Sequence, residues 1–230
     1  MSSSLLLPAL EVETGHTPDA TVIWLHGLGA DGHDFEPVIP EFKLPETLAL
    51  RFIFPHAPAR PVTLSGGYIM RAWYDIYEAT LRRRVDTHQL RESVRAVELL
   101  IDREMQRGIP AERIIIAGFS QGGAVALELA LRCSLPLGGL IALSTYLAIE
   151  ESVKAPLIRR SLPIFLAHGD QDDIVSPVLG DETDNLLRQA GFTPDYHRYP
   201  MGHSVCELEC QDIGHWLKHQ LQSSLHDATA

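Results

Sequence analysis

The chain has 230 residues, of which 45% are hydrophobic and 21% charged, and its formal net charge is −11 at pH 7. This length and composition predict a single domain, residues 1–230, large enough to fold without disulfides or a metal. The acidic balance argues against nucleic acid as a partner, and no run of 18 apolar residues predicts a membrane span. Three cysteines and no signal-peptide pattern predict a cytoplasmic location.

The first apolar run, Thr21–His26, has the composition of a buried strand and leads directly into a glycine-rich segment. Gly27, Gly29 and Gly32 follow it with the spacing Gly-x-Gly-x-x-Gly. After a strand, this spacing fits either a dinucleotide-binding loop or the oxyanion loop of a serine hydrolase. The first site belongs to a redox enzyme with a nicotinamide or flavin cofactor, and the second needs no cofactor.

A dinucleotide site has two further requirements that can be checked in the sequence. A helix must begin at the third glycine, and an acidic residue must follow about 20 positions later, at the end of the next strand. Pro37 and Pro40 interrupt any such helix, and the next strand, Arg51–Pro55, is followed by His56. The dinucleotide interpretation therefore fails on both requirements.

Between the second strand and the first long helix, the segment His56–Trp73 has no steady hydrophobic period. It contains prolines and a glycine pair, and long irregular segments of this kind usually have a function. We expect it to form a small irregular cover over a pocket. Leu28, Leu64 and Trp73 are the candidates to line an acyl pocket beneath it.

Apolar residues at helical spacing predict a helix from about Thr87 to Arg107. Asp86 and Gln89 have the spacing of a capping box, and Gly108 provides the stop. The basic cluster just before it, Arg82–Arg84, is interpreted as a solvated stretch.

The next strand, Arg113–Phe119, runs directly into Gly118-Phe119-Ser120-Gln121-Gly122, which matches the pattern Gly-x-Ser-x-Gly. An Ala- and Leu-rich helix, Gln121–Arg132, follows. Strand, turn and helix in this order are the context of a nucleophile elbow, in which a serine sits on a strained turn between small residues.

The remaining elements continue the alternation. The strands expected are Leu137–Ser144, Pro163–His168 and Asp195–Tyr199, and the helices are about Asp181–Ala190 and Glu207–Leu221. Apolar strands that alternate with helices predict an α/β fold with a mostly parallel sheet covered on both faces. The first few residues and about 223–230 are expected to be disordered.

A serine hydrolase of this type needs an acid and then a histidine after the serine. His203 lies on a loop between the last strand and the last helix, and it follows every acid candidate. Three aspartates compete in the loop after strand Pro163–His168, namely Asp170, Asp172 and Asp173. We favour Asp172 as the acid and expect Asp170 to cap the loop's own amides.

Taken together, five segments resemble the carboxylesterase and acyl-protein thioesterase family of α/β-hydrolases (the phospholipase/carboxylesterase group). They are residues 25–29 (LHGLG), 71–76 (RAWYDI), 118–123 (GFSQGG), 168–172 (HGDQD) and 202–204 (GHS). The resemblance spans about residues 20–220 and implies the α/β-hydrolase fold. The segment 71–76 and the short cover resemble the bacterial esterase branch.

The resemblance implies Ser120 as nucleophile, Asp172 as acid and His203 as base, with the backbone N–H groups of Leu28 and Gln121 forming the oxyanion hole. It implies no metal or cofactor. Members often have proline where this chain has Asp173, and a second carboxylate there is expected to raise the pKa of its neighbour.

The expected substrate is a small-molecule ester of small or medium chain length. Acyl-protein thioesterase or lysophospholipase activity with the same triad is the alternative, and a homodimer is compatible with the resemblance. A non-catalytic binding protein of the same fold is the remote alternative, because such proteins usually lack a triad member.

Overall fold

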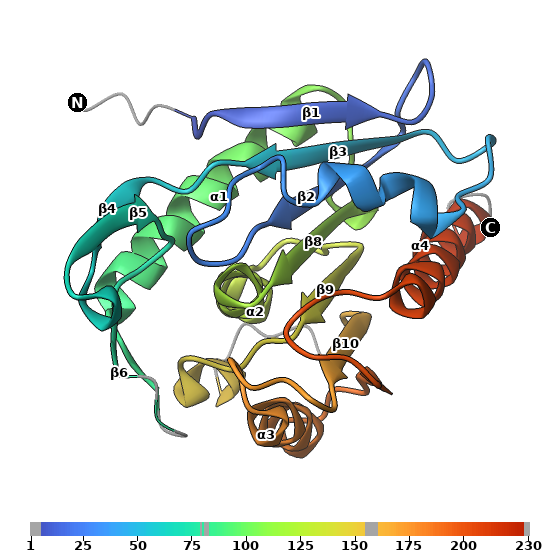
Figure 1. Ribbon diagram of the computed structural model, residues 1–230. Helices are drawn as coiled ribbons and strands as arrows, with labels where there is room; N and C mark the ends of the chain where they lie inside the picture. Colours follow the sequence, from blue (N-terminus) through green and yellow to red (C-terminus); the bar gives the residue numbers. More distant parts are fainter. Residues whose placement is uncertain (1–5, 79, 81–82, 155–160, 228–230) are drawn as a thin grey trace.

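The computed structural model describes residues 6–78, 80, 83–154 and 161–227, the last five by their backbone only (Figure 1). Its main feature is a seven-stranded sheet with the strand order β1-β3-β2-β8-β9-β10-β11. These strands are Ala9–Glu13, Leu50–Pro55, Ala20–Leu25, Ile114–Phe119, Gly139–Leu143, Ile164–Gly169 and Asp195–Tyr199, in that spatial order. All neighbouring pairs are parallel except β1 with β3.

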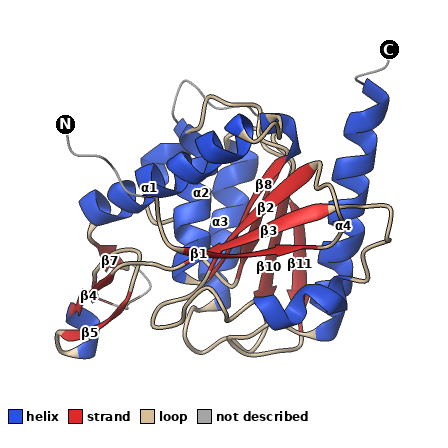
Figure 2. Ribbon diagram, turned by 90° about the horizontal axis from the view of Figure 1, so that it is seen from above, coloured by secondary structure: helices blue, strands red, loops and turns tan. Residues whose placement is uncertain are grey.

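Helices cover both faces of this sheet (Figure 2). One face packs against α1 (Thr87–Gln106), α2 (Gln121–Arg132) and α3 (Pro177–Gln189). The other face packs against α4 (Glu207–Asp227) and the short helix η1 (Glu36–Phe42). The architecture is the mostly parallel α/β fold that the alternation of strands and helices predicted, and it is the α/β-hydrolase fold that the family resemblance implied. Within the described residues, no helix is both long and apolar enough to cross a membrane.

The parallel register brings distant loops to one edge of the sheet. β8 ends at Phe119, one residue before the serine of the Gly-x-Ser-x-Gly pattern. β10 and β11 are neighbours, and Gly169 pairs with Tyr199 at their carboxyl ends. Because parallel strands end at the same edge, the loops after β8, β10 and β11 lie together there.

The segment His56–Trp73 is more regular than expected. It forms a two-stranded hairpin, β4 (Ala59–Val62) with β5 (Tyr68–Arg71), joined through η2 (Thr63–Ser65). The turn is made by Gly66 and Gly67, whose φ angles of 67° and 81° favour glycine. The expectation of an irregular segment was wrong. The glycine pair favours a hairpin turn, but the prolines in the segment argue against strands and led to the wrong prediction.

Further short elements were not anticipated from the sequence. β1 adds an antiparallel edge strand, and β6 (Ile76–Glu78) pairs with β7 (Arg84–Val85) just before α1. Helix α3 begins at Pro177, four residues before the expected start, and α4 continues through residues 223–227. Residues 1–5, 228–230 and Arg82, which were part of sequence predictions, lie outside the described residues.

Asp86 caps α1 by accepting a hydrogen bond from the Gln89 N–H, as predicted. The Gln89 side chain does not complete the capping box, because its oxygen accepts from Arg60 and from the Asp75 N–H. Gly108 ends the helix with φ 95°.

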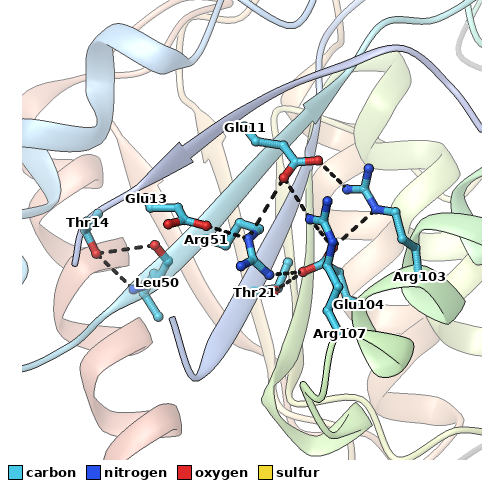
Figure 3. Close-up of polar contacts among 9 residues, drawn as sticks. All are labelled: Glu11, Glu13, Thr14, Thr21, Leu50, Arg51, Arg103, Glu104 and Arg107. Atoms are coloured by element: carbon cyan, nitrogen blue, oxygen red, sulfur yellow. Dashed lines mark hydrogen bonds and ion pairs between the residues drawn. The ribbon is translucent and has the colours of Figure 1, made fainter. Parts of the chain in front are cut away.

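The carboxylate of Glu104, near the end of α1, is fully buried and is surrounded by positive charge (Figure 3). It lies 2.7 Å from Arg51 Nη1, 3.0 Å from Arg107 Nη1 and 3.3 Å from Arg103 Nε. Thr21 Oγ1 donates a further hydrogen bond at 3.0 Å. This network ties β2 and β3 to α1 on the side of the sheet where β1 runs.

Candidate active site

Ser120 occupies the turn between β8 and α2 with φ 54° and ψ −118°. A non-glycine residue in this region costs about 1–3 kcal/mol and persists only where the surrounding structure holds it. A Cβ on Gly118 would lie 2.4 Å from the Gly122 backbone, and one on Gly122 would lie 2.3 Å from the Leu25 carbonyl oxygen. Both glycines are therefore required for the turn to close. This is the geometry of the nucleophile elbow expected from the sequence.

Three side chains from three loops form a hydrogen-bonded chain at the carboxyl edge of the sheet. His203 Nε2 lies 2.9 Å from Ser120 Oγ, and His203 Nδ1 lies 2.7 Å from Asp172 Oδ2. Asp172 and Ser120 are buried, and the His203 side chain is 16% exposed. Phe119 packs its ring against the imidazole at a centroid distance of 4.7 Å. Of the three competing aspartates, only Asp172 contacts His203.

Asp172 is held by more groups than the sequence suggested. Its Oδ1 accepts hydrogen bonds from the N–H groups of Ile174 and Val175 at 3.0 and 2.8 Å, and His168 Nε2 lies 3.4 Å from Oδ2. Burial alone would raise the pKa of this carboxyl, but the hydrogen bonds from His168, His203 and Val175 outweigh it and hold the pKa well below its usual range. Asp172 is therefore ionised at neutral pH.

The expectation that Asp173 would raise the pKa of Asp172 was wrong. Asp173 is exposed and lies at the mouth of the pocket, away from the hydrogen bonds that set the charge of its neighbour. Asp170 also differs from expectation, because its carboxylate pairs with Arg198 on β11 at 2.7 Å instead of capping its own loop.

His168 is a second histidine at Asp172 that the sequence did not reveal. It is fully buried, and its Nε2 lies 2.8 Å from the Val175 carbonyl oxygen. Because a carbonyl only accepts, Nε2 carries the proton, and the same N–H faces Asp172. His168 belongs to the segment 168–172 that carries the family resemblance. The sequence of this segment does not show whether the histidine contacts Asp172 or only packs in the core.

The loop after β2 is fixed by His26, which is buried. His26 Nδ1 lies 2.7 Å from the Gly27 carbonyl oxygen, and Nε2 accepts from the Ala57 N–H at 3.1 Å. These partners define the neutral tautomer, and burial lowers the His26 pKa to about 4. Within the described part of the chain, the backbone N–H groups of Leu28 and Gln121 donate to no protein acceptor. Both are free to donate to a substrate oxygen.

The side chain of Gln121 connects the elbow to the segment after β5. Its oxygen accepts from the Trp73 N–H at 2.8 Å, and its nitrogen donates to the Tyr74 carbonyl at 2.7 Å. Trp73 is fully buried, and its Nε1 donates to the His26 carbonyl. Trp73 therefore braces the loop after β2 and is not among the residues that line the pocket beside Ser120, which corrects its expected role.

A pocket of about 530 Å³ opens beside Ser120 and His203. Leu28 and Leu64, two of the three candidates from the sequence, line it together with Ile76, Tyr146 and Ile174. The space is large enough for a small organic substrate. Among the described residues, no three His, Cys, Asp or Glu side chains are grouped as metal ligands.

Comparison with known proteins identifies the family of this chain. The profile of the family described as "Phospholipase/Carboxylesterase" matches residues 8–221. The chain is 40% identical to "Acyl-protein thioesterase 1" of Neurospora crassa, covering 94% of this chain and 91% of that protein. It is 35% identical to "Carboxylesterase SOBER1" of Arabidopsis thaliana, covering 88% and 91%.

The structure is also similar to solved structures of SOBER1 and of an acyl-protein thioesterase. The crystal structure of Arabidopsis thaliana SOBER1 superimposes with a TM-score of 0.83 at 33% identity, covering 88% of this chain and 99% of that chain. Zea mays acyl-protein thioesterase 2 superimposes with a TM-score of 0.83 at 28% identity, covering 93% and 99%.

Proposed function

The chain belongs to the phospholipase/carboxylesterase family and is a hydrolase, and we propose that it cleaves carboxylic esters through an acyl-enzyme formed on Ser120. The observation that supports this most directly is the chain of hydrogen bonds from Ser120 Oγ through His203 to Asp172. A free hydroxyl is a weak nucleophile, and a neighbouring imidazole that takes its proton activates it.

In the proposed mechanism, Ser120 Oγ attacks the ester carbonyl while His203 Nε2 accepts its proton. The oxyanion that forms is stabilised by the N–H groups of Leu28 and Gln121. The imidazolium passes the proton to the leaving alcohol, and the acyl group stays on Ser120. Water, deprotonated by the same imidazole, then releases the acid and regenerates the serine. Asp172 keeps Nδ1 protonated and stabilises the imidazolium.

Small and medium-chain esters are the proposed substrates. Acyl-protein thioesterase activity is the second candidate, because the Neurospora and maize relatives carry that name. The relatives with 34–40% identity are fungal and plant proteins, so the comparisons give no support to the bacterial branch expected from the sequence. A cytoplasmic location and a single domain stay predictions from the sequence.

The test is a hydrolysis profile over p-nitrophenyl esters of two to twelve acyl carbons, run beside an S-acylated peptide of matched chain length. Ser120→Ala is the control, and it should lower kcat by about 10⁴–10⁶ while leaving the fold intact. A variant that keeps more than a tenth of the wild-type rate would remove Ser120 from the mechanism. A higher kcat/KM for the thioester at every chain length would favour the second candidate.

A further inference from the structure

Arg83 brings an unexpected positive charge to the pocket. It lies just before β7, and its guanidinium carbon is 5.0 Å from the centre of the Tyr146 ring. Its Nη2 donates to the Ile174 carbonyl in the loop that follows Asp172. Arg83 therefore lines the same pocket as Ser120, and it also borders a neighbouring groove along α3. It forms part of the wall between these two cavities.

This guanidinium has no carboxylate partner within the described residues, although Arg84 beside it pairs with Glu78 at 3.2 Å. The Arg83 Nε is buried and has no hydrogen-bond acceptor there. A buried donor without an acceptor is unfavourable, so an acceptor supplied by a ligand would be bound favourably at this position. Exclusion of water also strengthens an ion pair formed with a guanidinium.

The path from Ser120 to Arg83 is lined by side chains that suit methylene groups. Leu64, Ile76 and Tyr146 contribute apolar surface to the pocket wall. Tyr146 is fixed in place by its hydroxyl, which lies 2.8 Å from the hydroxyl of the buried Tyr74. The pocket therefore combines the proposed nucleophile, an apolar wall and a guanidinium that has no carboxylate partner among the residues described.

We propose that Arg83 binds a carboxylate at the far end of the acyl group, so that the enzyme favours monoesters of aliphatic dicarboxylic acids. This inference rests on the proposed function, because it assumes an acyl group on Ser120. Asp34 and Asp173 line the same pocket and oppose an anionic substrate. The attraction by the Arg83 guanidinium must exceed the repulsion of the substrate carboxylate by these two aspartates. Removing the charge of Asp173 should therefore strengthen the preference for dicarboxylic acid monoesters.

The experiment compares two esters that differ only at the end of the acyl chain, p-nitrophenyl hexanoate and mono-p-nitrophenyl adipate. The measured quantity is the ratio of kcat/KM for the adipate ester to kcat/KM for the hexanoate ester. Arg83→Met should lower this ratio roughly tenfold or more, mainly through KM of the adipate ester, because it removes a charge-assisted hydrogen bond. Arg83→Lys should retain part of the ratio, and Asp173→Asn should raise it.

Arg84→Met is the matched control, since it removes the same charge one residue away at an exposed position. It should leave the ratio unchanged. An equal fall in both arginine variants would indicate long-range attraction and overturn the proposal, as would a ratio in Arg83→Met within twofold of wild type.

Two further measurements distinguish a failure of carboxylate binding by Arg83 from a failure of the proposed ester hydrolysis. Hydrolysis of neither ester by the wild type, after subtraction of the Ser120→Ala rate, would contradict the proposed function itself. In the wild type alone, the adipate preference should fall as salt rises from about 0.05 to 0.5 M, because salt screens the ion pair. A preference that does not respond to salt would count against Arg83 even where Arg83→Met fails to fold.

Discussion

Glu104 and Asp172 are both buried carboxylates, yet their partners differ in kind. Glu104 faces three arginines and a threonine hydroxyl (Figure 3). Asp172 faces two histidines and two backbone N–H groups. Arginine stays protonated at any pH a protein tolerates, whereas imidazole gains and loses a proton near neutrality.

Glu104 and Asp172 also differ in where they lie relative to the pocket. The Glu104 network joins β2, β3 and α1, and none of its members lines the pocket beside Ser120. Asp172, by contrast, is hydrogen-bonded to His203, which contacts Ser120 and lines that pocket. A buried carboxylate is therefore not itself a sign of catalysis. The informative features are a partner that can titrate and a cavity that a substrate can reach.

The largest effect is expected at Asp172. Asp172→Asn keeps the shape but offers the wrong hydrogen-bonding group to His203, so kcat should fall by roughly 10³–10⁴ with little change in KM. The measurement is steady-state hydrolysis of one chromogenic ester. Asp173→Asn is the matched control and should lose less than about tenfold. The reverse pattern in the two variants would exclude Asp172 as the acid.

Glu104→Ala should affect stability and leave the chemistry alone. Removing one partner from a buried ionic network costs about 3–5 kcal/mol, because charged groups are left without compensation. For a chain of this size we expect Tm to fall by roughly 6–20 °C, with kcat of the folded protein unchanged. Glu13→Gln removes an exposed partner of Arg51 and should cost less than about 1 kcal/mol. A loss of kcat in folded Glu104→Ala would contradict the purely structural role assigned to Glu104.

The free energy of unfolding should fall at acid pH because of His26, which lies on the active-site side of the molecule. Burial lowers the His26 pKa from 6.5 to about 4 in the folded state. The unfolded chain therefore binds the extra proton between these values, and the stability present above pH 6.5 is lost as pH falls toward 4. One proton corresponds to about 1.4 kcal/mol per pH unit.

Replacing His26 with glutamine, which still offers one donor and one acceptor, should flatten this slope in urea unfolding experiments between pH 4 and 7. The Arg51 and Arg107 partners of Glu104 do not titrate in that range and should contribute no such slope. An unchanged slope in His26→Gln would show that other groups carry the acid sensitivity.

The smallest effect is expected at Asp170, the third aspartate of the loop. Its ion pair with Arg198 is half exposed, so Asp170→Asn should cost no more than about 1 kcal/mol. Thermal unfolding should show a small decrease in Tm, and the ester assay should show an unchanged kcat. A kcat below a tenth of wild type would mean that Asp170 has a role at the site.

Much of the fold could be predicted from local pattern. The buried strands β2 and β8 and helix α2 lie within one residue of their expected bounds, since each has a long apolar run with turn residues at its ends. Strand β1 could not be found in this way. It is short, half-exposed and at the sheet edge, so its residues need no hydrophobic pattern.

The proximity of Ser120 and His203 could be predicted, because a motif between strand and helix marks the serine and chain order with loop position restricts the choice of histidine. The candidate site was less predictable where a role depends on contacts across the fold. Trp73 was expected in the pocket as an apolar residue of the irregular segment, but its two N–H groups donate to the Gln121 side chain and the His26 carbonyl. His168 and Arg83 have contacts with Val175 and Tyr146 that no local pattern encodes.

The order of the three loops along the chain has a consequence for biosynthesis. Ser120 is made 52 residues before Asp172 and 83 before His203, and both partners depend on β10 and β11, which complete one side of the sheet. N-terminal parts of a chain generally fold first during translation. A nascent chain can thus form the elbow before His203 is in place, and without this base the hydroxyl of the proposed nucleophile is only weakly reactive. In the proposed mechanism, Ser120 therefore gains its base only after β11 has joined the sheet.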